Sequence, residues 1–223
     1  MNFHKQYPGL KNLILSIIDK KPECSAELKE IVKASDINRK ELLPFSDFDH
    51  PDHQSYGRKL IYENDVFTIY LMSWCPGDFT AIHDHGTTQW GCVLALDDFA
   101  HRLYHFKNDK LVLKDDKPFL KGQTASVYND VIHMMGNNGG KNALSLHIYG
   151  TNEPGKKVAQ RSRIFYPEIN QMTITQGAAY LYHPETFNHE LQDFNHIEES
   201  TLDDYLALVH STNVRSGSFK ILH

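Results

Sequence analysis

Two histidines spaced two residues apart, His83 and His85, form the clearest chemical pattern in the chain, within "AIHDHGTTQWG". In a strand, side chains at positions i and i+2 project to the same face. Both imidazoles would then point into a barrel interior, with Asp84 facing outward. Such a pair can chelate a divalent first-row metal, because imidazole suits iron, copper, nickel and zinc. Many His-x-His pairs are simply polar strand residues, so a metal site needs a third ligand.

His133, within "YNDVIHMMGNNGG", is the candidate for this third ligand. It lies between apolar residues on an expected strand, where an uncharged imidazole is either a hydrogen-bonded core residue or a ligand. The order of the histidine pair, then His133 and Asn137 about fifty residues later, resembles the two motif segments of the cupin barrel. Most cupins add a glutamate after the pair, but this stretch has no acid between Asp84 and Asp97. The pattern therefore predicts a three-histidine site without a carboxylate.

The strand "LSLHIYG" places Ser145, His147 and Tyr149 at alternate positions, where they would share one inward face. With the "IHDH" segment and the spacing from His133 to Ser145, it resembles the cysteine dioxygenase type I family over residues 50–165. The resemblance implies an Fe(II) site, a small thiol and dioxygen as substrates, and a sulfinic acid as product.

In this family reading, Tyr149 supplies a phenol near the oxygen-binding position, and His147 and Ser145 orient it. Without the resemblance, Tyr149 could equally be a core aromatic residue whose hydroxyl is bonded to His147. Two other cupin functions remain as alternatives. One is dioxygenation of a carbon substrate, and the other is metal or ligand binding without catalysis.

The substrate carboxylate has more than one candidate partner. "SYGRKLIY" is similar to the Tyr-x-Arg segment of animal-type cysteine dioxygenases, which assigns Tyr56 and Arg58 to substrate binding. A guanidinium suits a carboxylate because it can donate two parallel hydrogen bonds. "WGCVLAL" and "YGTN" instead resemble 3-mercaptopropionate dioxygenases, in which an arginine downstream of the tyrosine takes this role. Arg161 or Arg163 would then be the clamp. We expect L-cysteine as the substrate, with 3-mercaptopropionate as the alternative.

The three cysteines do not suggest a disulfide framework, and reduced thiols are expected. Animal cysteine dioxygenases carry a cysteine–tyrosine thioether, and the resemblance puts Gly91 at the position of that cysteine. Strand alternation would turn Cys92 to the opposite face, so no crosslink to Tyr149 is expected. Cys75 is expected to be a buried turn residue.

The elements that must position these residues are mainly β. Residues 56–150 read as short strands separated by turns, with no long helix between them, which favours a barrel over parallel βαβ units. We expect a single cupin domain over residues 1–223, a jelly-roll-like antiparallel β-barrel. Its parts would be N-terminal helices (1–45, with Ser25 as a helix cap), the barrel core (54–165) and a looser C-terminal extension (166–223). The extension would end in a helix capped by Ser200, with an apolar face made by Leu202, Tyr205, Leu206 and Val209.

Composition argues against several classes of partner. The chain has 223 residues and a net charge of −5, so we expect no general affinity for nucleic acid or acidic membranes. The N-terminal apolar run lacks a cleavage site and no stretch reaches a membrane span, so we expect a cytoplasmic protein. We also expect a monomer or weak homo-oligomer. Residues 184–204 contain seven acids and no Lys or Arg, which indicates a solvated face. The alternative there is a second metal site at His183, His189 and His196.

Overall fold

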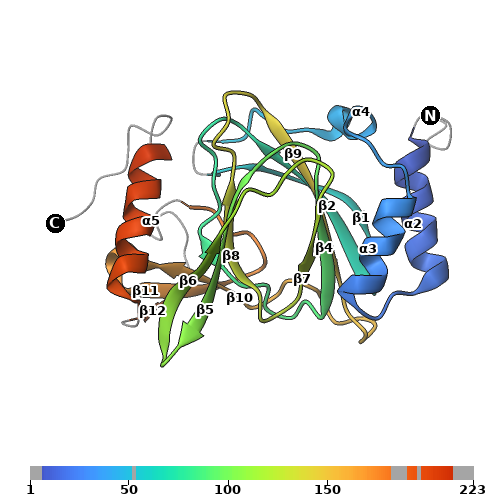
Figure 1. Ribbon diagram of the computed structural model, residues 1–223. Helices are drawn as coiled ribbons and strands as arrows, with labels where there is room; N and C mark the ends of the chain where they lie inside the picture. Colours follow the sequence, from blue (N-terminus) through green and yellow to red (C-terminus); the bar gives the residue numbers. More distant parts are fainter. Residues whose placement is uncertain (1–6, 52–53, 182–189, 195–196, 213–223) are drawn as a thin grey trace.

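The computed structural model describes residues 7–51, 54–181, 190–194 and 197–212. Two antiparallel sheets face each other, with helices on both flanks (Figure 1). The first sheet has the order β1 (Gly57–Glu63), β2 (Phe67–Trp74), β9 (Ala143–Gly150), β4 (Trp90–Ala95), β7 (Thr124–Val127). The second has the order β12 (Leu191–Asp193), β11 (Gln171–Thr175), β10 (Ser162–Tyr166), β3 (Ile82–His83), β8 (Ile132–Gly136), β5 (Ala100–Lys107), β6 (Lys110–Asp116). The described strands thus form two separate jelly-roll-like sheets and not one closed barrel.

Strand β9 is buried along its whole length because both faces of its sheet are covered. Leu144, Leu146 and Ile148 pack in the core cluster that includes the N-terminal helices. Tyr149 belongs to a different cluster, which lies between the two sheets. The alternation predicted for this strand is therefore observed, and it turns the polar residues of β9 toward the second sheet.

The N-terminal helices are α2 (Pro8–Lys20), α3 (Ser25–Ala34), α4 (Arg39–Leu42) and the 3-10 turn η1 (Leu43–Phe45). The prediction that Ser25 caps a helix is wrong, because Cys24 is the N-cap residue and Ser25 is the first helical residue. The Ser25 hydroxyl instead donates to the carbonyl of Val127 and accepts from the N–H of Gly91. A tertiary contact with β4 and β7 has replaced the local cap.

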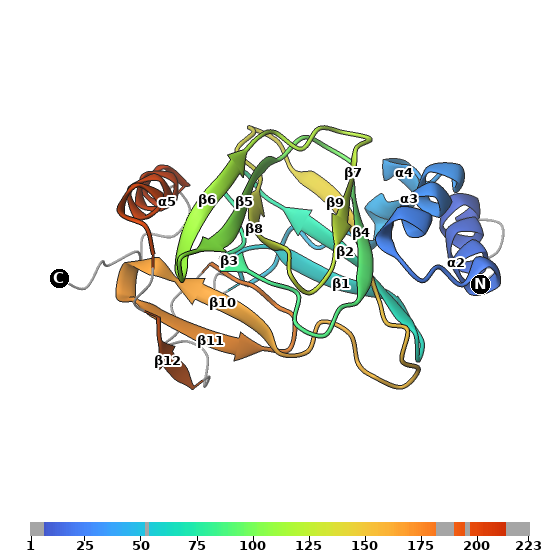
Figure 2. The same ribbon diagram turned by 60° about the horizontal axis from the view of Figure 1, so that its bottom comes forward.

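The C-terminal extension is more regular than the sequence indicated. Strands β10, β11 and β12 continue the second sheet beyond β3 (Figure 2), and the 3-10 turn η2 (Pro167–Ile169) joins β10 to β11. Helix α5 (Glu199–Thr212) is present, but Ser200 lies inside it and donates to Glu198. Tyr205 and Val209 are buried in the core of the second sheet, whereas Leu202 and Leu206 are partly buried. His183, His189 and His196 lie outside the described residues.

Within the ranges that the structure describes, no helix combines the length and the apolar character needed to cross a membrane.

Candidate metal centre and its surroundings

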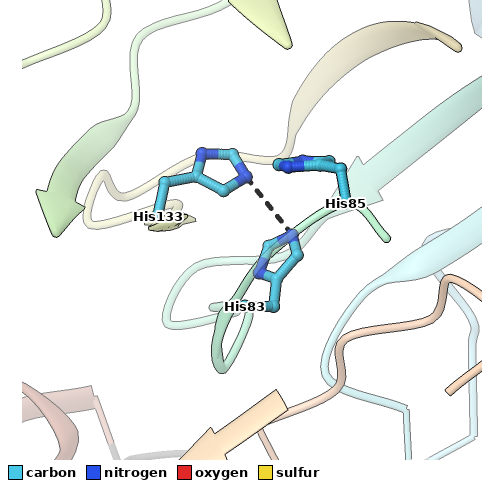
Figure 3. A group of neighbouring side chains, drawn as sticks. All are labelled: His83, His85 and His133. Atoms are coloured by element: carbon cyan, nitrogen blue, oxygen red, sulfur yellow. Dashed lines mark hydrogen bonds between the residues drawn. The ribbon is translucent and has the colours of Figure 1, made fainter. Parts of the chain in front are cut away.

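Three buried histidines meet between the sheets. His83 ends β3, His85 follows two residues later, and His133 lies in β8 directly opposite His83 in the register. Figure 3 shows the three imidazoles turned toward a common point, and their ligand nitrogens all lie within 4.8 Å of one another. The Nε2 atoms of His83 and His133 are 3.2 Å apart. The structure therefore brings together the three candidate ligands predicted from the sequence.

The other ring nitrogen of two of these imidazoles faces a backbone carbonyl. His83 Nδ1 lies 2.9 Å from the carbonyl oxygen of Ala81, and His85 Nδ1 lies 3.1 Å from that of Val131. A carbonyl oxygen only accepts, so Nδ1 carries the proton in both rings and Nε2 keeps its lone pair. This is the tautomer in which Nε2 can bind a metal.

His133 is oriented by a residue that the sequence analysis missed. Its Nδ1 lies 2.9 Å from Nε2 of His101 on β5. In the sheet, Leu103 pairs with His133 and His101 pairs with Met135. His101 therefore lies two residues from the register partner of His133, with its side chain on the same face. The signal was present in "AHRLYHF", but it depends on the β5–β8 register, which the sequence does not specify.

The surroundings keep these imidazoles neutral. Burial lowers the pKa of His83 to about 4 and the pKa values of His85 and His133 well below their usual value. The buried His85 Nε2 has no hydrogen-bond partner within the described part of the chain. The 3.2 Å between His83 and His133 Nε2 atoms is the spacing of two nitrogens about 2.1 Å from one ion. The residues present therefore fit a divalent cation held by three neutral imidazoles.

Asp84 does not face outward, and that prediction is wrong. It is 4% exposed, and its carboxylate accepts from the backbone N–H and the Nε of Arg163 and from the N–H of Gly86. Gly86 has φ +50°, and a Cβ there would lie 2.0 Å from the carbonyl oxygen of Gln160. The loop that carries His85 is thus pinned to the start of β10 by a buried carboxylate and a close backbone approach.

The polar face of β9 forms a hydrogen-bonded row across from the histidines. Tyr149 Oη lies 2.9 Å from His147 Nδ1, and His147 Nε2 lies 2.8 Å from Ser145 Oγ. The indole N–H of Trp74 donates to Ser145 Oγ. The rings of His85 and Tyr149 are 5.9 Å apart, so this row ends beside the metal candidates.

The row allows two arrangements of its protons, and one of them directs the Tyr149 hydroxyl proton toward the histidines. Burial lowers the pKa of His147 to about 3, so this imidazole is neutral. Since Ser145 Oγ accepts from Trp74, its own proton can go to His147 Nε2, which leaves His147 Nδ1–H to donate to Tyr149. The Tyr149 hydroxyl proton is then available toward the histidines. Burial also raises the pKa of Tyr149, while the nearby Arg58 opposes this rise.

Of the three arginines considered, only Arg58 faces this region. Its guanidinium stacks on the Tyr70 ring, with 3.6 Å from Cζ to the ring centroid, and its buried Nε has no partner among the described residues. Arg163 is paired with Asp84. Arg161 is exposed.

Tyr56 is buried two residues before Arg58 in the sequence, and its hydroxyl accepts from the N–H of Ala179. Its ring stacks on that of Trp74, with centroids 4.8 Å apart. Tyr56 thus connects the strand of Arg58 to the segment that follows β11.

The cysteines lie away from Tyr149. Gly91 is the register partner of Tyr149, whereas Cys92 packs in the core cluster that contains the helices. Cys92 and Tyr149 therefore point to opposite faces of the sheet, and a thioether between them is geometrically excluded. Cys75 is buried in the turn after β2.

A cavity of about 220 Å³ reaches His133 from the side of β5 and β7. Its lining is mostly apolar and includes Val93, Leu103, Ala125 and Val127. Of the three candidate ligands, His133 lines this cavity, together with its neighbour His101.

The chain was compared with protein families and with solved structures. The family model described as cysteine dioxygenase type I matches residues 6–158. The solved structure of TT1209 from Thermus thermophilus is similar at 15% identity, covering 49% of this chain and 92% of that chain, with a TM-score of 0.40. A conserved protein with a double-stranded beta-helix domain from Klebsiella pneumoniae subsp. pneumoniae is 15% identical, covering 53% of this chain and 94% of that chain, with a TM-score of 0.39.

A Cupin_2 domain of an XRE family transcriptional regulator from Enterobacter cloacae is also similar, at 12% identity. It covers 45% of this chain and 100% of that chain, with a TM-score of 0.36. At these TM-scores, nothing about activity follows from the structural likenesses.

Proposed function

The chain belongs to the cysteine dioxygenase type I family of thiol dioxygenases, and from that premise we propose that Fe(II) is its metal and L-cysteine its substrate. The fold is a cupin, and the enzyme is an oxidoreductase that takes a small thiol and dioxygen. The reaction would be R–SH + O₂ → R–SO₂H, in which both oxygen atoms end on sulfur and the sulfur supplies the electrons. No external reductant is needed for this balance.

The observation that carries the proposal is the meeting of two different polar sets between the sheets. The three Nε2 atoms of His83, His85 and His133 come from the second sheet and its loop, and the Tyr149 row comes from the first. Bound iron would supply a redox-active centre with positions open to a thiolate and to dioxygen. The histidines would hold it, with the second ring nitrogens fixing their orientation.

We assign Arg58 to the substrate carboxylate. The buried Nε of Arg58 has no partner among the residues that the structure describes, which is unfavourable unless a ligand compensates it. A carboxylate can do so through two charge-assisted hydrogen bonds to the guanidinium. Arg58 also acts on the pKa values of Tyr149 and His147, which places its charge close to the row. Tyr56 would support this side of the pocket from behind.

Tyr149 would act as the proton-holding residue of the site. With His147 Nδ1–H donating to its oxygen, its hydroxyl proton can be directed at the oxygen or sulfur of the reacting group. His147 and Ser145 would be positioning residues, and Trp74 would keep Ser145 in place.

The test is oxygen consumption by the iron-loaded protein with L-cysteine, 3-mercaptopropionate and cysteamine in parallel, with mass spectrometry of the products. The first two thiols carry a carboxylate, and cysteamine has only the amine. Sulfinate formed from cysteine in preference to both others is expected. A preference for 3-mercaptopropionate would keep the carboxylate site and reject cysteine as the substrate. A preference for cysteamine would reject Arg58 as the clamp, and no uptake with any thiol would reject the proposal.

A further inference from the structure

A second group of metal-ligating side chains lies outside the three-histidine centre. His50, Cys75 and Asp78 place one ligand atom each within 4.8 Å of the others. The side chains of His50 and Asp78 are 5% and 3% exposed, and Cys75 is 1% exposed. None of these residues takes part in the site described above.

The geometry comes from a tight turn and a crossing loop. After β2, the N–H of Asp78 donates to the carbonyl of Cys75, and the N–H of Cys75 donates to the Asp78 carboxylate. This turn, "CPGD", sets the two side chains next to each other. His50 comes from the loop before β1, and its Nε2 lies 3.0 Å from Asp78 Oδ2.

We propose that His50 Nε2, Cys75 Sγ and Asp78 Oδ2 form a second, structural site for a zinc-like divalent cation. Two residues separate Cys75 from Asp78, which is the short spacing that brings paired ligands together in structural zinc sites. The nitrogen, sulfur and oxygen donors match a borderline-soft ion. A thiolate, a carboxylate and a neutral imidazole also balance the double positive charge, so the loaded site is neutral, as burial requires.

The contacts of His50 and Cys75 agree with this assignment. His50 Nδ1 lies 3.4 Å from the carbonyl oxygen of Pro51, while Nε2 faces the carboxylate of Asp78. A neutral imidazole has one proton for these two acceptors. On Nε2 it forms a hydrogen bond to Asp78, and on Nδ1 it leaves the Nε2 lone pair available to a cation that the carboxylate shares. The carbonyl oxygen of Phe48 lies 3.3 Å from Cys75 Sγ and places a further oxygen donor at the edge of the cluster.

The site would join parts of the chain that support the catalytic row. The carbonyl of Asp78 accepts from the N–H of Asn137, and the Asn137 amide donates to the carbonyl of Trp74. Trp74 in turn donates to Ser145. A cation here would fix the loop around His50 against the end of β2, next to Trp74.

Cobalt(II) is the first probe, because a cobalt–thiolate bond gives a near-ultraviolet charge-transfer band and the three-histidine centre contains no thiolate. The full-length protein is titrated with cobalt(II) in a thiol-free buffer. We expect the band in the wild type, in Cys24→Ser and in Cys92→Ser, and its loss in Cys75→Ser. A wild type without the band, or a band that survives in Cys75→Ser, overturns the proposal.

Zinc content is the second measurement, made on a variant that lacks the first centre. The full chain carrying His83→Ala, His85→Ala and His133→Ala should still bind one zinc ion, detected by elemental analysis after dialysis. Adding Asp78→Asn or His50→Gln should weaken zinc binding by more than the roughly ten-fold cost of losing an outer-shell partner.

Circular dichroism verifies folding of every variant. If Cys75→Ser does not fold, the wild-type cobalt band and its weakening in Asp78→Asn decide the question. Absence of zinc from a folded triple variant would overturn the proposal, because the three side chains would then be joined by hydrogen bonds alone. Neither measurement depends on thiol oxidation, so failure here leaves the proposed function untouched.

Discussion

At the scale of single residues, burial determines the protonation states on which the site depends. The imidazoles of His83, His85 and His133 are neutral because their charged forms are poorly solvated between the sheets. Backbone carbonyls then select which nitrogen stays free in His83 and His85, and His101 contacts the second ring nitrogen of His133. The same burial makes Tyr149 a holder of its proton and not a phenolate.

His101 should control the affinity of the centre for its metal. In His101→Phe, Nδ1 of His133 loses its hydrogen-bond partner, and we expect metal affinity to fall about 10- to 100-fold. His101→Gln keeps a side-chain acceptor and should restore part of this affinity. Competition titration with a chromophoric chelator measures the effect, and His210→Phe, an exposed position on α5, is the control. Equal affinities in His101→Phe and the wild type would show that His133 needs no such partner.

Arg58 should discriminate between thiols by their carboxylate. Loss of two charge-assisted hydrogen bonds in Arg58→Gln should raise the KM for cysteine by about 10- to 100-fold or more. The KM for cysteamine should hardly change, because it has no carboxylate. Arg161→Gln is the matched control, since that arginine is exposed. A wild-type KM for cysteine in Arg58→Gln would contradict the assignment.

Tyr149 should affect turnover without affecting metal binding. In Tyr149→Phe the ring remains but the hydroxyl proton is lost, so kcat should fall by about 100-fold, at the lower end of general acid–base effects. Elemental analysis should find the same metal content as in the wild type. A variant that loses its metal would identify Tyr149 as a ligand or a structural support instead.

At the scale of elements, a very short strand carries much of the site. Strand β3 has only two residues, and it pairs with β10 on one side and β8 on the other. His85 lies beyond its end, so sheet hydrogen bonds do not position this ligand. The contacts of Asp84 with Arg163 and Gly86 take their place.

Removal of the Asp84 carboxylate should therefore destabilise the protein. In Asp84→Ala, the backbone N–H of Arg163 loses a charge-assisted partner in a buried place, and we expect a loss of about 2–3 kcal/mol in the free energy of unfolding. Arg163→Ala should cost less, because its side chain is 42% exposed. Urea unfolding of the two metal-free variants measures both losses of free energy. A neutral Asp84→Ala would mean that the loop is held by backbone pairing alone.

At the scale of the whole molecule, the site exists because two sheets supply different chemistry to the same interior. The second sheet and its loop supply the histidines, and the first supplies Arg58 and the Tyr149 row. The C-terminal extension forms one wall of this interior, through contacts of residues 179–181 with Ser55 and Tyr56. The N–H of Ala179 donates to Tyr56, the N–H of Leu181 donates to Ser55, and the Tyr180 ring lies 4.9 Å from the Tyr56 ring.

This wall predicts a distant effect of the Tyr56 hydroxyl. Tyr56→Phe leaves the buried N–H of Ala179 without its acceptor, which should cost about 1–3 kcal/mol of stability. Faster hydrogen exchange in residues 177–181 should accompany this loss, with unchanged metal content. Tyr128→Phe, at a half-exposed position, is the control. Unchanged exchange in that segment would show that other contacts hold the extension in place.

The sequence alone determined the properties that depend on residue type and local spacing. Alternation in "LSLHIYG" predicted which face of β9 would carry Ser145, His147 and Tyr149. Alternation in the strand of Gly91, together with the family resemblance, predicted that Cys92 would turn away from Tyr149. The three histidines could be selected because the order of the pair and His133 resembles the motif segments of the cupin barrel, whereas each of them alone could be an ordinary polar strand or core residue. Helical and strand-like periodicities predicted the order of elements up to β9.

Only the tertiary structure decided the contacts made between segments that are distant in the chain. The pairing of His101 with His133 depends on the register of β5 against β8, and the use of Asp84 and Arg163 depends on the approach of β10 to β3. Serine is a typical helix N-cap residue, yet the Ser25 hydroxyl bonds to the backbone of β4 and β7. These backbone groups lie next to the start of the helix only in the folded chain. These hydrogen bonds depend on which distant groups the fold brings close together, and the local sequence does not specify those groups.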